Sequence, residues 1–212
     1  IIVSDVMMPR MNGYKLCKTI KEDINISHIP VILLTARDDR QSQISGYKNG
    51  ADGYLSKPFE VEMLMELIRN RLKNREYTKK RYLNAGLIPT PEESTISLTD
   101  ETFLIKLNSI IQENIENSNL GIQFICQEVG LGRSSLYNKL KALTGMGANE
   151  YISKLRIEKA ITLISGTDMP FSEIAEKTGF TTPSYFSTAF KQYTGETPSQ
   201  YKERKKKGLA GK

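Results

Sequence analysis

The chain has 212 residues, a net charge of +6, 39% hydrophobic residues and 25% charged residues, which excludes a disordered or collagen-like chain and fits one or two folded domains. Charged residues interrupt each apolar run before the roughly 18 residues that a membrane-spanning helix needs, and the first residues do not resemble a signal peptide. The two cysteines, Cys17 and Cys126, lie far apart in apolar helical patterns, which favours reduced core thiols in a cytoplasmic protein without membrane contact over a disulfide framework or a metal site.

The first third of the chain alternates short apolar runs with amphipathic segments. Strands are predicted at 1–4, 31–34 and 53–56, and helices after residue 12, over 41–48 and from 60 to about 75. Continuous apolar strands that alternate with helices are typical of a parallel sheet covered on both faces. We therefore predict an α/β domain over residues 1–76.

Residues 77–99 lose this pattern, and the stretch 89–94 contains two prolines, which disfavour a helix, and few apolar groups, so we predict a linker there. Positive charge gathers near it and at the end of the chain: residues 73–81 hold five Lys or Arg against one Glu, and residues 202–212 hold six against one. Residues 101–201 hold nine Lys or Arg against ten Asp or Glu. Charge alone therefore does not predict DNA binding, and we interpret residues 206–212 as a solvated basic tail.

Residues 100–205 are predicted to be helical throughout, and they contain an internal repeat. The pattern recurs at a spacing of 49 residues before a glycine-containing turn and of 50 residues beyond it. Gly130 and Gly179 stand in the two turns, where a residue that tolerates positive φ is needed. One amphipathic helix over 151–165 separates the copies. Two matches in register predict an all-α domain with two helix-turn-helix units.

The outward face of each second helix carries polar side chains suited to reading a major groove of DNA. These residues are Arg133, Ser134, Tyr137, Asn138 and Lys141 in the first copy, and Thr182, Ser184, Ser187, Thr188 and Lys191 in the second. Asn138 fits a two-bond contact with adenine, whereas Lys141 and Lys191 fit phosphates. The alternative is a merely solvated face, and Thr182 serves equally well as a helix N-cap.

Longer motifs occur in the central helix and the second copy. They are Arg156-Ile157-x2-Ala160, Ala175-x3-Gly179-Phe180, Tyr185-Phe186-x3-Phe190-Lys191 and Gly195-x-Thr197-Pro198-x2-Tyr201. With these motifs the second domain resembles the AraC/XylS family of DNA-binding domains. The resemblance implies two units joined by one rigid helix, which bind double-stranded DNA at two elements about one helical turn apart. The family commonly has Arg or Gln where this chain has Thr182, Ser184 and Thr188, so no base preference follows.

Three polar residues end the predicted strands of the first domain: Asp5, Thr35 and Lys57. If the strands are parallel neighbours, their carboxyl ends meet at one edge of the sheet. A carboxylate there can attack phosphorus and form an acyl phosphate, while a hydroxyl and an ammonium hold the phosphoryl oxygens. Each residue alone has an ordinary interpretation, but their ordered spacing favours a phosphoryl site.

The same residues lie within longer motifs: Asp5-Val6-Met7-Met8-Pro9, Leu34-Thr35-Ala36 and Lys57-Pro58-Phe59. With them, the first domain resembles the later part of a response-regulator receiver domain, which has a flavodoxin-like parallel sheet. The resemblance implies that Asp5 accepts a phosphoryl group from a histidine kinase, and that Asp5 and the backbone carbonyl of Met7 contribute to a Mg²⁺ site. It also implies that Thr35 follows the phosphate, that Tyr54 swings inward behind it, and that the bond before Pro58 is cis.

The first strand of that family ends in an acidic pair that binds Mg²⁺, and no such strand precedes Ile1 here. In the family's 2-1-3-4-5 strand order, it would lie beside residues 1–3. We therefore expect a truncated receiver without its first two strands, with an exposed apolar edge and inefficient phosphorylation.

Together the domains predict a DNA-binding transcription regulator of a two-component phosphorelay. Phosphorylation of Asp5 in the complete protein would pair receivers and place a homodimer on adjacent DNA sites, where it engages RNA polymerase, with activation the favoured outcome. The organisation is also similar to the C-terminal part of hybrid two-component regulators, in which the kinase and the receiver share one polypeptide.

Two alternatives stay open. Enzymes of the haloacid-dehalogenase type also use Asp, Thr and Lys at strand ends, but they need a second Asp where Met7 stands, so no enzymatic activity is expected. The other alternative is a phosphorylation-independent AraC-type regulator, whose receiver remnant only mediates association.

Overall fold

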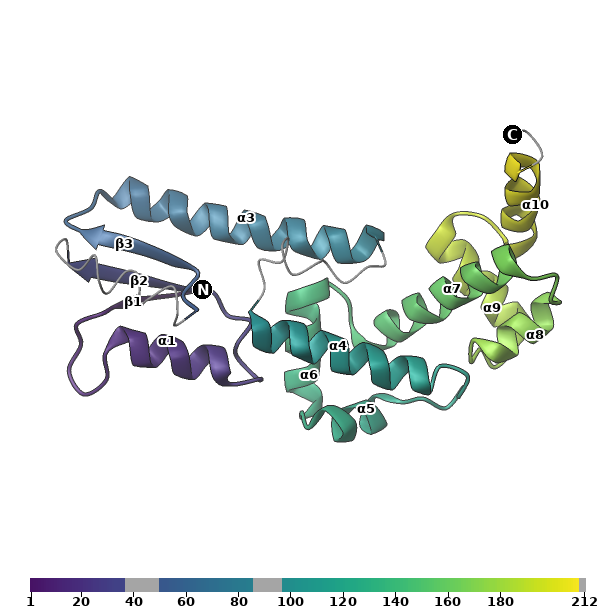
Figure 1. Cartoon of the computed structure of the whole chain (residues 1–212), viewed down its shortest axis with the longest axis horizontal. Coiled ribbons are helices and arrows are strands. Elements are labelled where there is room, and N and C mark those ends of the chain that lie inside the picture. The colour runs from purple at the N-terminus through teal and green to yellow at the C-terminus, as the bar shows by residue number, and fades with distance from the viewer. Residues whose placement is uncertain (37–49, 86–96, 210–212) are drawn as a thin grey trace. The chain divides into compact units, whose positions relative to one another are not determined.

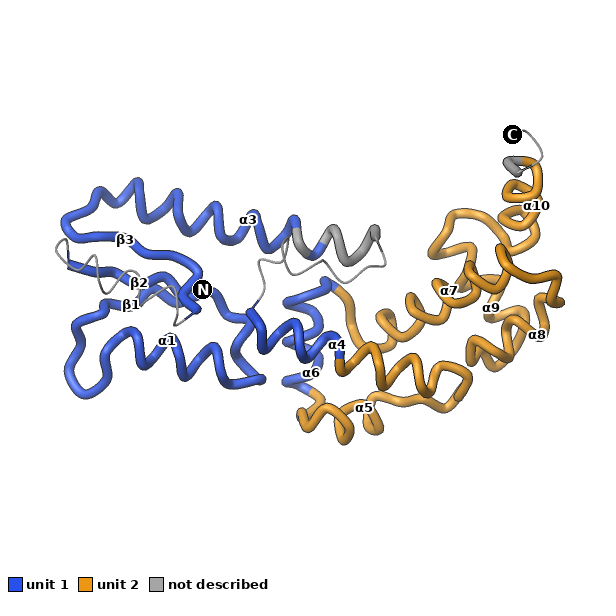
Figure 2. The backbone as a smooth tube through the Cα atoms, in the orientation of Figure 1, with its two compact units in different colours: residues 1–105, 134–145 blue, residues 106–133, 146–212 orange. Residues whose placement is uncertain are grey.

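The computed structural model describes residues 1–36, 50–85 and 97–209. The chain divides into two compact units: unit 1 comprises residues 1–105 and 134–145, and unit 2 comprises residues 106–133 and 146–212 (Figure 2). The helix predicted over 41–48 lies outside the described residues. No helix in the described ranges is long and apolar enough to cross a membrane.

Unit 1 contains a parallel sheet in the order β1 (Ile2–Asp5), β2 (Val31–Ala36) and β3 (Gly53–Lys57), which confirms the predicted strands and their parallel arrangement. The first half of the middle strand is fully buried, as expected for a parallel sheet covered on both faces. Helix α1 (Gly13–Glu22) lies on one face and helix α3 (Val61–Ala85) on the other (Figure 1).

The turn from β1 into α1 requires Asn12 and Gly13. The Asn12 side chain caps the helix by accepting a hydrogen bond from the Lys15 backbone N–H at 2.8 Å. Gly13 approaches the end of β1 so closely that a Cβ at this position would lie 2.4 Å from the carbonyl oxygen of Asp5. A side chain at residue 13 would therefore displace the segment that carries Asp5.

Helix α3 is longer than the sequence predicts. It continues to Ala85, nine residues into the stretch predicted as a linker, so it crosses the predicted boundary at residue 76. The loss of the apolar pattern therefore does not mark the end of the helix. Lys and Arg are strong helix formers, and the ion pair between Lys79 and Glu76, at 2.6 Å, supports the helix at i,i+3 spacing.

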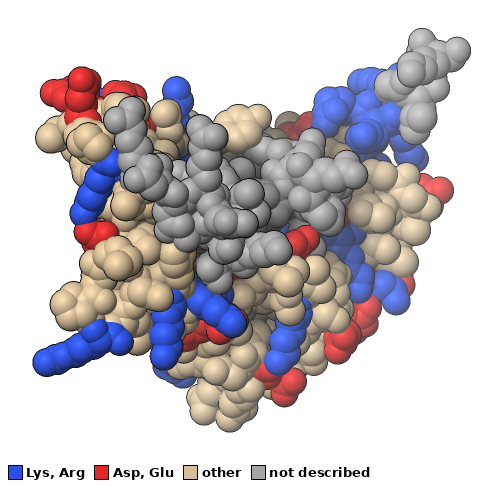
Figure 3. All heavy atoms as spheres, turned by 60° about the vertical axis from the view of Figure 1, so that its left-hand side comes forward, with Lys and Arg blue, Asp and Glu red and all other residues tan. Residues whose placement is uncertain are grey.

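The remainder of the described chain is helical, as predicted. Its helices are α4 (Leu98–Glu113), which runs from unit 1 into unit 2, α5 (Ile122–Val129), α6 (Arg133–Thr144), α7 (Ala148–Gly166), α8 (Phe171–Lys177), α9 (Pro183–Thr194) and α10 (Pro198–Leu209). Residues 206–209, predicted as part of a solvated tail, instead extend α10, because a lysine-rich end suits the negative pole of a helix. Figure 3 shows Lys and Arg side chains gathered over this helix.

One core cluster of unit 2 combines aliphatic and aromatic side chains from α7, α8, α9 and α10. The rings of Phe186 and Phe190 lie 5.7 Å apart, and that of Phe190 lies 5.6 Å from Tyr201. Ala175 is 1% exposed, and Gly179 has a φ of 72°, as the predicted turn requires. A Cβ on Gly179 would lie 2.2 Å from the carbonyl oxygen of Ile115. The predicted architecture of the second copy is therefore confirmed.

Candidate functional site

The carboxyl edge of the sheet brings together the ends of the two outer strands in the described sheet. The Nζ atom of Lys57, at the end of β3, donates a hydrogen bond to Oδ2 of Asp5, at the end of β1. The other carboxylate oxygen of Asp5 accepts a hydrogen bond from the Met7 backbone N–H at 3.1 Å. These two donors hold the carboxylate in a fixed position at this edge.

Asp5 is poised in its charged form. The hydrogen bond from Lys57, and then that from the Met7 backbone, hold the pKa of Asp5 below its usual value. The carboxylate faces a shallow hollow, which is lined by Asp5, Met7, Ala36, Lys57, Pro58 and Phe59. The peptide bond between Lys57 and Pro58 is cis, as predicted. An ionised carboxylate beside an ammonium group in an open hollow can attack an electrophilic phosphorus atom.

Thr35 and Tyr54 do not line this hollow. Thr35 follows Leu34, the β2 partner of Asp5, and is 1% exposed. Its hydroxyl is buried and has no hydrogen-bond partner among the described residues. Tyr54 is half-buried and packs against the apolar cluster under α1 that includes Val31 and Leu33. Thr35 therefore offers a hydroxyl close to the edge, although it does not line the hollow itself.

The described residues do not make a complete Mg²⁺ site. Mg²⁺ prefers about six oxygen ligands, of which one or two are carboxylates. Among the residues that the structure describes, Asp5 is the only carboxylate lining the hollow, and no three His, Cys, Asp or Glu side chains lie close enough together to hold a metal. Asp5 and the backbone at Met7 can contribute to such a site, but the other ligands are not among the described residues.

We call the second helix of each helix-turn-helix copy its reader helix; α6 is the reader helix of the first copy and α9 that of the second. Helix α9 presents the polar residues predicted for it. Thr182, Ser184, Thr188 and Lys191 are exposed and Ser187 is half-buried, whereas Phe186 and Phe190 on the opposite face are fully buried. Thr182 caps the helix by accepting a hydrogen bond from the Tyr185 backbone N–H at 3.1 Å, which supports the N-cap interpretation of that residue. Its hydroxyl is thus partly engaged before any DNA contact.

Sequence reasoning gave Tyr185 no role, yet it belongs to this surface. The side chain is 55% exposed, and its ring meets the ring of Phe180 edge-on at 5.6 Å. The signal was available, because Tyr185 lies three residues before Thr188 and therefore on the same side of the helix.

Helix α6 presents the first set in the same manner. Arg133, Ser134, Tyr137, Asn138 and Lys141 are all exposed, and Tyr137 is 54% exposed. Leu136 and Leu140 are buried on the other face. The sequence pattern missed Lys139, which is fully buried although it stands between the exposed Asn138 and the buried Leu140.

Two family models match the chain. The response regulator receiver domain covers residues 1–69, and the helix-turn-helix domain covers residues 125–204. Histidine kinase P4 of Formosa agariphila is 43% identical over 204 residues, which make up 96% of this chain but 15% of that protein. Heme response regulator HssR of Staphylococcus saprophyticus is 49% identical over 73 residues, 34% of this chain and 31% of that one. The chain therefore spans less than a third of either relative.

Among solved structures, the chain is similar to the C-terminal domain of AraT, a response regulator from Geobacillus stearothermophilus. The two are 31% identical with a TM-score of 0.46, and the match covers 48% of this chain and 84% of that one.

Proposed function

This chain carries a response regulator receiver domain followed by an AraC-type helix-turn-helix domain, and from that premise we propose that it is the DNA-binding output segment of a two-component phosphorelay. The observation that carries the proposal is the exposure of polar residues on both reader helices, each opposite a buried apolar face. A helix of this kind can enter a major groove while its other face stays in the core.

On the DNA side, each reader helix occupies one major groove, and the two grooves lie about ten base pairs apart on one face of the duplex. Asn138 has the donor and acceptor that recognise adenine, and the hydroxyls of Ser184 and Ser187 suit bases or phosphates. Lys141 and Lys191 pair with phosphates and set the register. The first copy then supplies more of the base discrimination than the second.

On the receiver side, Asp5 takes a phosphoryl group from a histidine kinase. The phosphoryl group carries close to two negative charges, while the Asp5 carboxylate gives up its own charge in forming the acyl phosphate, so Lys57 would exchange its carboxylate partner for phosphoryl oxygens. Complete receivers bind Mg²⁺; here the chain's own contribution is Asp5 and the backbone at Met7. Because Met7 stands where a phosphohydrolase would carry its second Asp, the proposed role is a switch without catalytic turnover.

The partners follow from these two sites. Nearly all of this chain matches a small part of a histidine kinase, which supports a phosphodonor on the same polypeptide. Paired receivers would bring two DNA-binding domains onto adjacent sites in the cytoplasm and raise avidity without any new contact with DNA. Contact with RNA polymerase and activation of transcription complete the proposal.

Selection from random double-stranded DNA by this chain tests the DNA-binding part. We expect enriched sites with two short elements about ten base pairs apart. Recovery of unenriched sequence would overturn it. Replacement of Asp5 by Asn in the complete protein tests the phosphorylation part: loss of promoter control is expected, whereas unchanged control would support the phosphorylation-independent regulator.

A further inference from the structure

A buried polar triad joins the first reader helix to the receiver. Lys139 of α6 forms an ion pair with Asp100 of α4, and neither side chain is more than 4% exposed. Ser27, also fully buried, donates its hydroxyl hydrogen to Oδ1 of Asp100 at 2.7 Å and accepts a hydrogen bond from Nζ of Lys139 at 2.8 Å. The three groups therefore satisfy one another in a closed triangle, all within unit 1.

The triad links segments that are far apart in the sequence. Ser27 lies in the loop between α1 and β2 of the receiver, whereas Asp100 and Lys139 belong to the helical segments that follow α3. Further hydrogen bonds accompany it. The Thr99 hydroxyl donates to the carbonyl of Lys21 at 2.8 Å, and Nε of Arg75 donates to the carbonyl of Ala142 at 3.4 Å.

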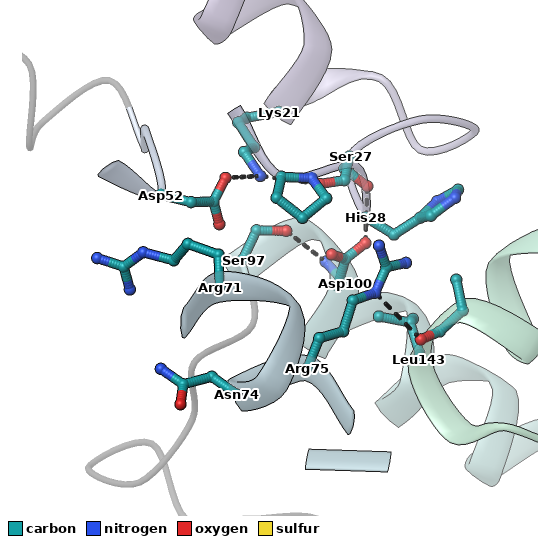
Figure 4. Close-up of a pocket in the computed structure, with 12 residues that line it drawn as sticks. Lys21, Ser27, His28, Asp52, Arg71, Asn74, Arg75, Ser97, Asp100 and Leu143 are labelled. Carbon is teal, nitrogen blue, oxygen red and sulfur yellow. Dashed lines mark hydrogen bonds and ion pairs between the residues drawn. The ribbon is translucent and has the colours of Figure 1, made fainter. Parts of the chain in front are cut away.

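The surroundings are those of a seam rather than a core. Ser27 and Asp100 line a cavity of about 70 Å³ whose walls come from receiver elements and from α4 and α6 (Figure 4). Lys21, His28 and Arg75 line it on the receiver side, with Asp100 and Leu143 opposite. Interfaces between domains are more polar than cores and are filled less completely.

A buried ion pair contributes more to choosing one arrangement than to net stability, because both charges lose their hydration. Burial accordingly lowers the pKa of Lys139, against the opposing effect of Asp100. The apolar residues of α6 can pack against many apolar neighbours, but buried Lys139 needs a counterion and hydrogen-bond acceptors. Asp100 is the counterion, and the Ser27 hydroxyl is the acceptor that the receiver provides.

We propose that the loop between α1 and β2 of the receiver is a docking surface for the first reader helix, and that Ser27 couples receiver docking to the position of α6 through Asp100 and Lys139. The exposed residues Tyr137 and Asn138 remain uncovered in this arrangement, so docking favours the DNA-binding state. The effect on DNA rests on the proposed function, whereas the docking itself does not.

Four variants of the full chain test the proposal, the fourth combining the first with the third. Ser27→Ala removes the hydroxyl; Thr19→Ala removes an exposed hydroxyl from α1 and serves as the matched control. In the third, Asp100→Leu with Lys139→Met, apolar side chains replace the ion pair. Hydrogen–deuterium exchange of the α6 amides reports docking, and exchange in α8 and α9 reports whether the rest of the chain stays folded.

We expect Ser27→Ala to speed exchange in α6 and to weaken binding to a selected DNA site, each by about tenfold or more, because Ser27 bonds to two charged groups and the loss of one such hydrogen bond alone is worth about that factor. Thr19→Ala should change neither, and adding Ser27→Ala to the apolar pair should have little further effect. The proposal is overturned if Ser27→Ala behaves like Thr19→Ala. It is also overturned if Ser27→Ala has the same effect in the original chain as in the Asp100→Leu, Lys139→Met variant. If Ser27→Ala unfolds the chain, Ser27→Cys takes its place.

Exchange and DNA binding separate the two proposals. If neither the original chain nor any variant binds DNA, the proposed function is wrong, and exchange in α6 still tests the docking proposal. If the chain binds DNA but Ser27→Ala leaves exchange in α6 unchanged, only the docking proposal is wrong.

Discussion

The two copies of the helix-turn-helix repeat support their reader helices by different means. In α9 the buried positions are held by neutral aromatic rings, those of Phe186 and Phe190. In α6 the buried face includes the charge of Lys139, which is satisfied by Asp100 and by Ser27 of the receiver. The second copy is thus held by its own domain, whereas the first depends on a partner that the receiver supplies. A repeat can keep its pattern while one copy becomes open to regulation.

The largest expected effect comes from breaking the ion pair between Lys139 and Asp100, which supports α6. Asp100→Ala leaves Lys139 buried without its counterion and should lower the free energy of unfolding by about 3–5 kcal/mol. Asp168, whose side chain is 89% exposed and pairs with Lys202 at 3.3 Å, is the matched control. Because Asp168 is exposed to solvent, Asp168→Ala should change the free energy of unfolding very little. Urea denaturation measures both, and equal losses would contradict the contrast between the copies.

The burial of His28 near Lys139 and Arg75 should also make the stability of unit 1 sensitive to acid. Burial, and then the positive charges of Lys139 and Arg75, lower the pKa of His28 to about 4. The unfolded chain therefore takes up a proton between about pH 6.5 and pH 4 that folded His28 does not. The stability that neutral His28 contributes is complete above pH 6.5 and falls by roughly 1–3 kcal/mol as the pH approaches 4.

His28→Gln isolates this contribution from those of the carboxylates. Unfolding free energies are measured for both proteins from pH 7.5 to pH 4, and the original chain should lose roughly 1–3 kcal/mol more than the variant as the pH falls. Parallel curves would show that His28 keeps its ordinary pKa in the folded unit.

On the DNA face, the first copy should discriminate bases more than the second. Asn138→Ala should remove about 1–3 kcal/mol of preference for adenine at one position of a selected site. Thr188→Ala, which removes a hydroxyl that already donates to the Ser184 carbonyl at 3.1 Å, should change any preference by less. Binding titrations on all four bases at each position provide the measurement. If Thr188→Ala changes the base preference more than Asn138→Ala does, the second copy discriminates bases more than the first.

Lys191 is expected to show the smallest and least specific effect. Because it faces phosphates in our proposal, Lys191→Ala should weaken binding to every sequence alike and reduce the slope of log affinity against log salt by about 1. A change confined to one base position would contradict a phosphate contact.

The sequence predicted the parts of the fold that are governed by regular patterns. The three strands and their parallel order follow from continuous apolar runs, and Gly179 follows from the positive φ that the turn demands. The meeting of Asp5 and Lys57 follows from the rule that parallel strands end at one edge. These inferences need only the local spacing of residues.

The remainder depends on distant partners. Nothing near Lys139 in the sequence indicates that it is buried, because its partners lie 39 and 112 residues away. Helix α3 passes residue 76 because helix propensity persists where the apolar pattern stops. The spacing of the two readers on DNA stays a prediction.

In the proposed complex, both reader helices bind one face of a duplex. Hydroxyl-radical footprinting of the full chain on a selected site can detect this arrangement. We expect two protected stretches about ten base pairs apart, the first lost with Asn138→Ala and Tyr137→Ala and the second with Ser184→Ala and Ser187→Ala. A single protected stretch, or one that none of these substitutions affects, would contradict it.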